Sequence, residues 1–192
     1  MFLSHPQALD ELRTPRLKLR APTRRDAKFI HEAVQETLDE LVLWLPWAHP
    51  GYSLLDTRQF ISAIRRLRRN GQSFDYLIED SESGRVLGMI SLHRLDWLRQ
   101  SAGLGYWVRR SAWGQGFATE AGHGIIDVGF RNYGLNRIEA HVAPPNKASQ
   151  AVIEKLRMKH EGVSRGLEKL NGEFVDHIQY AILSRDYAGG RR

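Results

Sequence analysis

The sequence predicts an α/β fold with a mixed central sheet flanked by helices. Short segments with the pattern of strands alternate with longer amphipathic segments, in the order β-α-α-β-β-β-α-β-α-β-β. The length of 192 residues corresponds to about one domain. No linker, repeat or low-complexity segment divides the chain. We therefore expect a single domain over residues 1–192.

The first quarter of the chain begins with a strand and a helix. Residues 16–21 alternate apolar and polar side chains, as a half-buried strand does. Thr23 and Asp26 have the spacing of a capping box, which predicts a helix over about 25–38. We expect residues 43–52 to form an aromatic loop after this helix.

A second helix is predicted to begin after Ser53. Its apolar and basic side chains separate onto two faces, with Phe60, Ile61, Ile64 and Leu67 on one and Arg58, Arg65 and Arg69 on the other. The pattern then changes to strands at 74–79, 85–95 and 103–108. The apolar stretch from Val86 to Leu92 is typical of a central strand covered on both faces.

The second half of the chain contains two more helices, a strand and a hairpin. The predicted elements are a helix over about 118–133, a strand over 137–142, a helix over about 147–158 and a hairpin of 161–170 with 173–183. Asn146 follows two prolines and is a good N-cap. Asn171-Gly172 is a strong signal for a two-residue hairpin turn.

The composition excludes several classes of protein. With no cysteine, the chain has no disulfide, thiolate metal site, iron–sulfur cluster or cysteine-bound acyl intermediate. The 8 histidines show no metal-ligand spacing, so we expect no metal. We see neither the pattern of a secretion signal nor a run of about 18 apolar residues. A soluble, cytoplasmic protein is the expectation.

Solubility is the first explanation of the basic charge, and an anionic ligand or partner is the alternative. The chain has 28 basic and 22 acidic residues, a net charge of +6, and 22 of the basic residues are arginine. Arginine binds phosphate and carboxylate groups through a planar set of donors.

Two glycines flank one residue between the strand over 103–108 and the next helix. Gly114 and Gly116 let the backbone approach a ligand closely, and the first turn of the helix offers unpaired N–H groups, as a pyrophosphate site requires. Phe117-Ala118 excludes a P-loop, and Thr119 replaces the third small residue of a dinucleotide fingerprint. From this spacing alone, a tight turn without a ligand is the alternative.

The segment GYWVRRSAWGQGFATEA resembles the GNAT superfamily of acyl-CoA-dependent N-acetyltransferases, and specifically its RimJ/RimL ribosomal-protein branch. The resemblance continues through TPRLKLRAPTRRDA, GMISLHRL and NKASQAVIEKL to the final hairpin. It implies the GNAT fold, with a mostly antiparallel sheet and acetyl-CoA as co-substrate. It also implies a splayed strand pair, 106–108 against 137–142, that leaves a slot for the pantetheine. The residues implied to bind acetyl-CoA are Tyr106, Trp107, Val108, Gly114, Gln115, Gly116, Phe117, Ala118, Thr119, Asn146 and Ser149.

The family's Asn-x-x-Ser pattern falls on Asn146 and Ser149. Alone, these residues indicate only a helix N-cap and a polar first turn. The resemblance implies that Asn146 binds the pantetheine arm or orders the strand end, and that Ser149 lies near the thioester sulfur. Many members use a tyrosine at the position of Ile153 as general acid, so Ser149 is the remaining candidate here. The family's Lys-x-Gly-Phe ending is replaced by Lys155–Met158, which leaves the local turn open.

The general base must lie outside the position that relatives often use, because Gly103 stands where they carry a glutamate. We expect Glu168, before the hairpin turn, to be the base or to anchor the amine; a solvated hairpin charge is the alternative. Asp96 and His93, at the end of the strand over 85–95, are further candidates.

An N-terminal α-amine is the expected acceptor. At pH 7 an α-amine is about 14% neutral and a lysine side chain about 0.04% neutral, a difference worth about 3.5 kcal/mol. An α-amine therefore tolerates a distant or water-relayed base better. Trp44, Trp47 and His93 are expected to line the acceptor cleft, although helix packing explains the tryptophans equally well.

The predicted function is direct transfer of the acetyl group of acetyl-CoA to the N-terminal α-amine of a protein, ribosomal by the resemblance. Backbone amides near Val108 would polarise the thioester carbonyl, and Ser149 and Glu168 are the predicted catalytic residues. Two alternatives stay open. One is a small-molecule amine acceptor such as a polyamine, an antibiotic or an amino-acid-like compound. The other is a CoA-binding module with weak catalysis.

The expected partners are acetyl-CoA and the amine acceptor, with a homodimer as one expected assembly and no membrane. The run from Arg65 to Arg69 is typical of a solvated helix face, with steering of CoA, an acidic protein or ribosomal RNA as the alternative. The run lacks interleaved aromatic residues, so nucleic-acid binding is not the expected main function.

Overall fold

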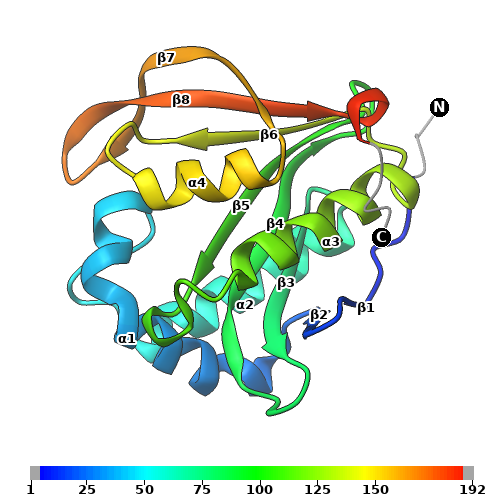
Figure 1. Ribbon diagram of the computed structural model, residues 1–192. Coiled ribbons are helices and arrows are strands. Elements are labelled where there is room, and N and C mark those ends of the chain that lie inside the picture. Colours follow the sequence, from blue (N-terminus) through cyan, green and yellow to red (C-terminus); the bar gives the residue numbers. More distant parts are fainter. Residues whose placement is uncertain (1–4, 188–192) are drawn as a thin grey trace.

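A computed structural model describes residues 5–187 and contains an eight-stranded sheet (Figure 1). The strands lie in the order β1-β2-β3-β4-β5-β6-β8-β7. Their bounds are β1 Glu11–Arg13, β2 Leu17–Arg20, β3 Ser73–Asp80, β4 Val86–Asp96, β5 Ser101–Val108, β6 Arg137–Val142, β7 Lys159–Leu170 and β8 Glu173–Leu183. All neighbouring strands are antiparallel except β5 and β6, which are parallel. The predicted mixed, mostly antiparallel sheet is confirmed.

Helices cover both faces of the sheet and form two hydrophobic cores. The helices are α1 (Ala27–Trp44), α2 (Leu54–Arg69), α3 (Phe117–Arg131) and α4 (Lys147–Lys155). In β3, Tyr76 belongs to the core that contains α3 and α4, whereas its neighbour Leu77 belongs to the core that contains α1 and α2. Successive side chains of a strand point to opposite faces, so the two pairs of helices lie on opposite sides of the sheet.

The parallel strands β5 and β6 separate soon after they begin. Their residues pair only from Ser101 to Gly103, opposite Arg137 to Glu139, and β5 then continues to Val108 without β6 beside it (Figure 1). Backbone groups of the second half of β5 therefore face an open slot. The predicted splaying of this strand pair is confirmed.

The first helix differs from the prediction. It extends to Trp44, six residues beyond the expected end, and it follows a short 3₁₀ turn over Arg24–Asp26. Leu41 continues its buried face, and Pro46 disfavours a helical conformation at Leu45. Residues 43 and 44 therefore belong to the helix rather than to the loop.

Other boundaries follow the local signals. Ser53 caps α2 by accepting a hydrogen bond from the Asp56 amide, and Asn171-Gly172 joins β7 to β8 with positive φ angles of 50° and 92°. The helix after Asn146 ends at Lys155, earlier than expected, because Arg157 has a φ of 60°. Strand β1 was not predicted, since it has only three residues, two of them exposed.

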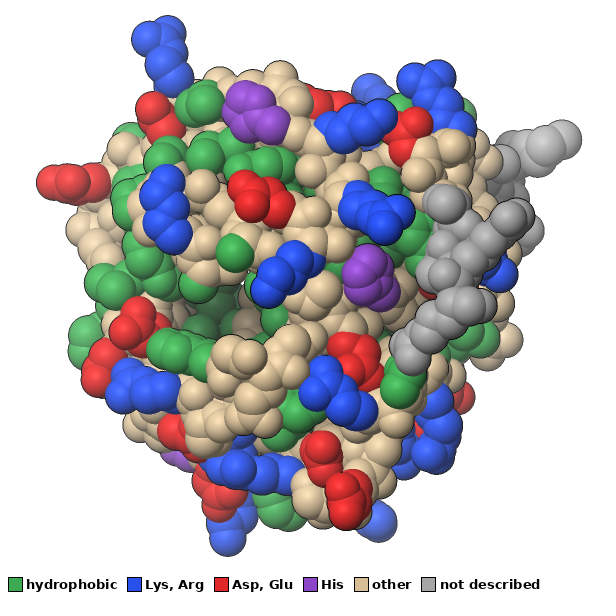
Figure 2. Space-filling model, viewed as in Figure 1, with side chains coloured by type: hydrophobic (Ala, Val, Ile, Leu, Met, Phe, Trp, Pro, Cys, Tyr) green, Lys and Arg blue, Asp and Glu red, His purple; other side chains and the backbone are tan. Residues whose placement is uncertain are grey.

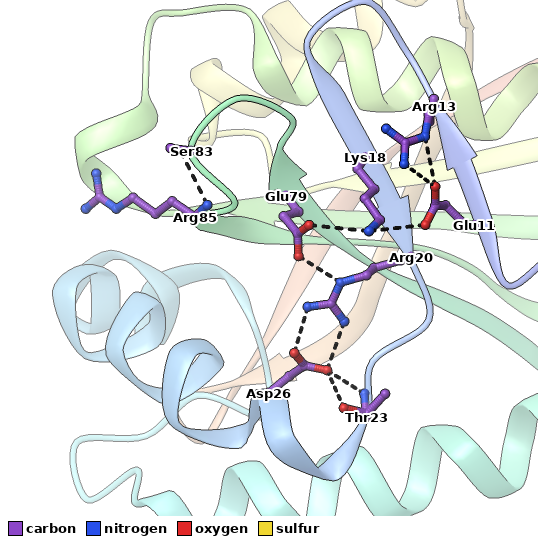
Figure 3. Close-up of polar contacts among 9 residues, drawn as sticks. All are labelled: Glu11, Arg13, Lys18, Arg20, Thr23, Asp26, Glu79, Ser83 and Arg85. Atoms are coloured by element: carbon purple, nitrogen blue, oxygen red, sulfur yellow. Dashed lines mark hydrogen bonds and ion pairs between the residues drawn. The ribbon is translucent and has the colours of Figure 1, made fainter.

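A chain of ion pairs ties β2 and β3 to the start of α1 (Figure 3). The Arg20 guanidinium donates to Asp26 at 2.7 Å and to Glu79 at 2.7 Å. Asp26 also accepts hydrogen bonds from the backbone and the hydroxyl of Thr23, as the capping box predicts. Burial opposes ionisation of Asp26, but Arg20 and Thr23 lower its pKa overall. The capping-box residue Asp26 therefore also holds the start of α1 against β2 and β3.

Candidate active site

The glycine turn after β5 is open on its outer side. Gly114 and Gly116 have φ angles of 72° and 81°, a region that favours glycine, and Gly116 is the N-cap of α3. The first backbone bond of α3 runs from the Glu120 amide to the Gly116 carbonyl, so the amides of residues 117–119 precede it. A β-carbon at Gly114 would meet nothing within 4 Å. These amides and the positive end of the helix dipole can bind a pyrophosphate.

Helix α1 holds the segment that leads into this turn. The Glu36 carboxylate accepts hydrogen bonds from Arg109 Nε and from the Ser111 amide, each at 2.7 Å, and the Thr37 hydroxyl accepts from the Arg110 amide at 3.0 Å. Hydrogen bonding from Arg109, partly opposed by burial, lowers the pKa of Glu36 to about 2. No local pattern in the sequence indicates these contacts.

Two further side chains shape the turn. The Trp113 indole donates to the Val108 carbonyl at 2.6 Å and so closes the end of β5. The Arg16 guanidinium donates to the Gln115 carbonyl at 3.1 Å and lies 4.5 Å from the centre of the Phe117 ring. The sequence did not single out Arg16, although it places a positive charge beside the turn.

Ser149 meets a tyrosine from the opposite side of the slot. Its amide donates to Asn146 Oδ1 at 3.0 Å, and its hydroxyl lies 2.8 Å from the Tyr106 hydroxyl. Burial raises the pKa of Tyr106 to about 12, with a smaller opposing effect from Ser149. Tyr106 therefore stays protonated at neutral pH and can donate a proton. Ile153, where many relatives have tyrosine, is fully buried in the core.

A cavity of about 550 Å³ adjoins Tyr106 on the face of the sheet covered by α1 and α2. Figure 2 shows a hollow with hydrophobic side chains, which lies near the end of β5. Six of the predicted site residues line the cavity, namely Trp44, Trp47, His93, Tyr106, Trp107 and Glu168. The Trp47 ring lies 6.3 Å from that of Trp107 and 5.5 Å from that of Tyr52, so aromatic side chains form one wall.

His93 occupies the space above Gly103. A β-carbon at Gly103 would lie 2.5 Å from His93 Cε1, so the glycine makes room for the imidazole. Burial, followed by the charges of Arg94 and His141, lowers the pKa of His93 to about 4. The imidazole is therefore neutral at pH 7. Its Nδ1 accepts a hydrogen bond from Arg94 Nε at 3.3 Å, so Nε2 carries the proton and can donate one hydrogen bond.

Three carboxylates line the cavity, and two of them have histidine neighbours. Glu168 Oε2 lies 3.8 Å from His177 Nε2, and Glu139 Oε2 lies 3.7 Å from His141 Nε2. The third is Asp75, on β3. Only Glu168 in this group was predicted as a site residue, because the other two lie on separate strands and belong to no motif.

Two other expectations are corrected. Asp96 accepts hydrogen bonds from the backbone and guanidinium of Arg99 and does not line the cavity, so it caps the β4–β5 turn. Within the run from Arg65 to Arg69, Arg68 is not on the solvated face, since its guanidinium lies 5.1 Å from the centre of the Tyr76 ring. Both side chains thus have structural partners.

Together, the split strand pair, the open glycine turn and the adjoining cavity define a GNAT acetyltransferase. Residues 16–159 match the family described as the acetyltransferase (GNAT) domain, and the chain belongs to this family. It is 34% identical to the uncharacterized N-acetyltransferase p20 of Bacillus licheniformis over 181 residues, which are 94% of this chain and 100% of p20.

Two other relatives carry names from the RimJ/RimL branch. The structure of Mycobacterium smegmatis RimJ in complex with CoA-disulfide matches with a TM-score of 0.88 and 27% identity, and covers 96% of this chain and 92% of that one. The [ribosomal protein uS5]-alanine N-acetyltransferase of Escherichia coli (strain K12) is 25% identical over 94% of both chains. The predicted resemblance to GNAT acetyltransferases of the RimJ/RimL type is confirmed.

Within residues 5–187, no helix is long and apolar enough to cross a membrane. In the same range, no three His, Asp or Glu side chains come together as a group able to hold a metal ion. The first four residues, part of the segment inspected for a secretion signal, lie outside the described residues.

Proposed function

We propose that this acetyltransferase transfers the acetyl group of acetyl-CoA to the N-terminal α-amine of a protein, with a ribosomal protein as the first candidate. The observation that carries the proposal is the position of Tyr106. Its hydroxyl contacts Ser149 beside the open slot, and Tyr106 is also one of the residues that line the cavity. One residue therefore borders both substrate sites. The name of the [ribosomal protein uS5]-alanine N-acetyltransferase supports the acceptor class.

In the proposed reaction, the neutral amine attacks the thioester carbonyl carbon, a C–N bond forms and the C–S bond breaks. The amides of 117–119 hold the pyrophosphate, and backbone groups of β5 up to Val108 lie along the slot for the pantetheine. Tyr106 and Ser149 protonate the departing thiolate. Glu168, or a water bound to it, takes the proton that the amine loses.

A small-molecule amine is the second candidate acceptor. The observation that favours it is the cavity itself, because about 550 Å³ with an aromatic wall is within the range of small-ligand sites. An extended protein N-terminus needs only the first few residues to enter the same space, so both acceptors fit the volume.

The test is a screen for CoA thiol release with purified protein and acetyl-CoA. Peptides that begin with alanine or serine, polyamines, aminoglycosides and free amino acids are offered at equal concentration, and mass spectrometry locates the acetyl group. Acetylation of peptide α-amines supports the proposal. Preference for a small amine would replace it with the second candidate, and binding of acetyl-CoA without turnover on any amine would favour a CoA-binding module.

A further inference from the structure

Asp75 is a carboxylate in the cavity that the proposed reaction does not use. It lies on β3 and accepts a hydrogen bond from the Ser73 hydroxyl at 2.7 Å. Among residues 5–187, no lysine, arginine or histidine nitrogen comes within 4.0 Å of it. The positive charge of Arg68 lowers the pKa of Asp75. The Arg68 guanidinium, however, donates a hydrogen bond to the Leu9 carbonyl and forms an ion pair with Asp10.

Burial makes this unpaired carboxylate unfavourable as an anion. Burial raises the pKa of Asp75 to about 6, against smaller opposing effects of Ser73 and Arg68. Above that pH the fold holds an anion in the cavity without an ion-pair partner, an arrangement that costs free energy unless a cation joins it. The other two cavity carboxylates differ, since each has a histidine neighbour.

The surroundings of Asp75 also suit a cation. The aromatic wall includes Trp47, Tyr52 and Trp107, whose ring faces attract positive groups. Besides Tyr52 and Tyr106, the charged and titratable groups that line the same cavity are His93 and Arg94 from β4, Glu139 and His141 from β6, Glu168 from β7 and His177 from β8. Of these, His93 is neutral at pH 7 because burial keeps its pKa low.

The strand register places Asp75 away from the reacting amine. Asp75 pairs with Ser91 of β4, and Ser91 pairs with Gly105 of β5, in the part of β5 that borders the slot. Two strand spacings separate β3 from β5, which is about 10 Å. The proposed transfer takes place at the slot, so a group bound to Asp75 is a different part of the acceptor.

We propose that Asp75 binds a positively charged group of the acceptor, about 10 Å from the amine that is acetylated. For a peptide acceptor, this is a basic side chain at the residue after the N-terminal one, since an arginine there has the required reach. The inference rests on the proposed transfer to an amine and names the acceptor class more closely. Asp75 is then a specificity-determining residue and takes no part in the chemical step.

The test compares two peptides that differ only in charge. The amides of alanine-arginine-alanine and alanine-citrulline-alanine have side chains of equal length, and neither side chain is itself an acceptor. Both are measured at pH 8 by thiol release, and by calorimetric binding to protein saturated with CoA. The variants are Asp75→Asn and, as a control, Asp39→Asn, which removes an exposed carboxylate of α1.

We expect the unchanged protein to prefer the arginine peptide about tenfold or more, mainly through KM. The preference falls below about twofold in Asp75→Asn and persists in the control variant Asp39→Asn. The thermal midpoint of Asp75→Asn at pH 8 rises, because an unpaired, half-buried charge is gone; a purely structural carboxylate would give a lower midpoint. Equal use of both peptides by the unchanged protein, or a preference that survives in Asp75→Asn, overturns the inference.

The binding measurement separates this inference from the proposed function. An Asp75-dependent binding preference without α-amine acetylation would support the inference and contradict the α-amine proposal. Acetylation of both peptides with equal efficiency would support the α-amine proposal and contradict the inference about Asp75. If neither peptide binds or reacts, both proposals fail.

Discussion

The hydroxyl of Tyr106 on β5 lies 2.8 Å from the hydroxyl of Ser149 on α4. The contact bridges the slot where β5 and β6 separate, and Tyr106 also lines the cavity beyond. A serine alone is a weak proton donor, but a neutral tyrosine beside it supplies a second hydroxyl. In the proposed reaction, the pair takes the place of the tyrosine that many relatives have at the position of Ile153.

We expect Tyr106→Phe and Ser149→Ala each to lower kcat by about ten- to a hundredfold, because the thiolate loses its proton source. The double variant should be little slower than either single variant, since the two hydroxyls act as a unit. Steady-state kinetics and calorimetric binding of acetyl-CoA provide the measurement. Ser62→Ala is the control, because this exposed hydroxyl of α2 bonds only to the Arg58 carbonyl. If the double variant lost kcat by the product of the two single losses, a shared role of the two hydroxyls would be contradicted.

Gly114→Ala should weaken acetyl-CoA binding by more than about tenfold, because the methyl group occupies the space offered to the pyrophosphate. Gly84→Ala is a matched control, since the two glycines have φ angles of 72° and 70° and neither has an atom within 4 Å of the added carbon. Both variants should lose about 1 kcal/mol of stability through backbone strain. Equal acetyl-CoA affinity in the two variants would place the pyrophosphate elsewhere.

Glu36→Gln should lower the free energy of unfolding by about 2 kcal/mol, because Arg109 is then left buried without its anion. It should also weaken acetyl-CoA binding, since the segment before the glycine turn loses its anchor on α1. Asp39→Asn, an exposed carboxylate of the same helix, should change neither quantity. Denaturant titration and calorimetry measure the two effects.

The pH dependence of the Glu36 contribution has a defined sign. Arg109 holds the folded pKa of Glu36 near 2, below its ordinary value of 4.5. The contribution is therefore complete above about pH 4.5 and disappears as the pH falls through 2. The difference in the free energy of unfolding between the unchanged protein and Glu36→Gln should therefore become smaller as the pH falls from 4.5 to 2.

His93→Gln should reduce the loss of stability between pH 6.5 and pH 4. Burial holds the folded pKa of His93 at about 4, below its ordinary value of 6.5, so the unfolded chain binds the proton first and acid favours unfolding. The effect reaches about 2 to 3 kcal/mol at pH 4. Asp75, with its pKa raised to about 6, acts in the opposite direction, so the variant must be compared with its own parent.

The check is denaturant unfolding at several pH values, with His49→Gln as the control because this side chain is half exposed. A pH profile of His93→Gln that parallels that of the parent would contradict the burial of a neutral imidazole at this position.

Arg157→Gly should raise the free energy of unfolding by about 1 kcal/mol. Arg157 has a φ of 60°, a conformation that costs a side-chain-bearing residue about that much and glycine nothing. The family's glycine at this position thus reflects a turn that this chain keeps. Ala151→Gly, an exposed position inside α4, should instead destabilise by a similar amount. Thermal unfolding of both variants provides the comparison.

Several parts of the site could be predicted from local sequence. The Gly114-Gln115-Gly116 turn, the N-cap at Asn146 and the hairpin turn at Asn171-Gly172 depend on the conformations of a few consecutive residues. Such conformational preferences belong to the residues themselves, so they can be predicted without knowledge of the fold. The order of strands and helices followed from hydrophobic periodicity for the same reason, whereas the short strand β1 left no such pattern.

The amino-acid sequence by itself determined the fold class, the glycine turn and the absence of cysteine chemistry. Only the tertiary structure decided which side chains meet. Tyr106 and Ser149 are 43 residues apart, Glu36 and Arg109 are 73 apart, and His93 reaches Gly103 across two paired strands. Strand pairing and helix packing bring these groups together, and no short-range preference encodes such contacts. The position of Asp75 in the lining of the cavity is a product of that packing alone.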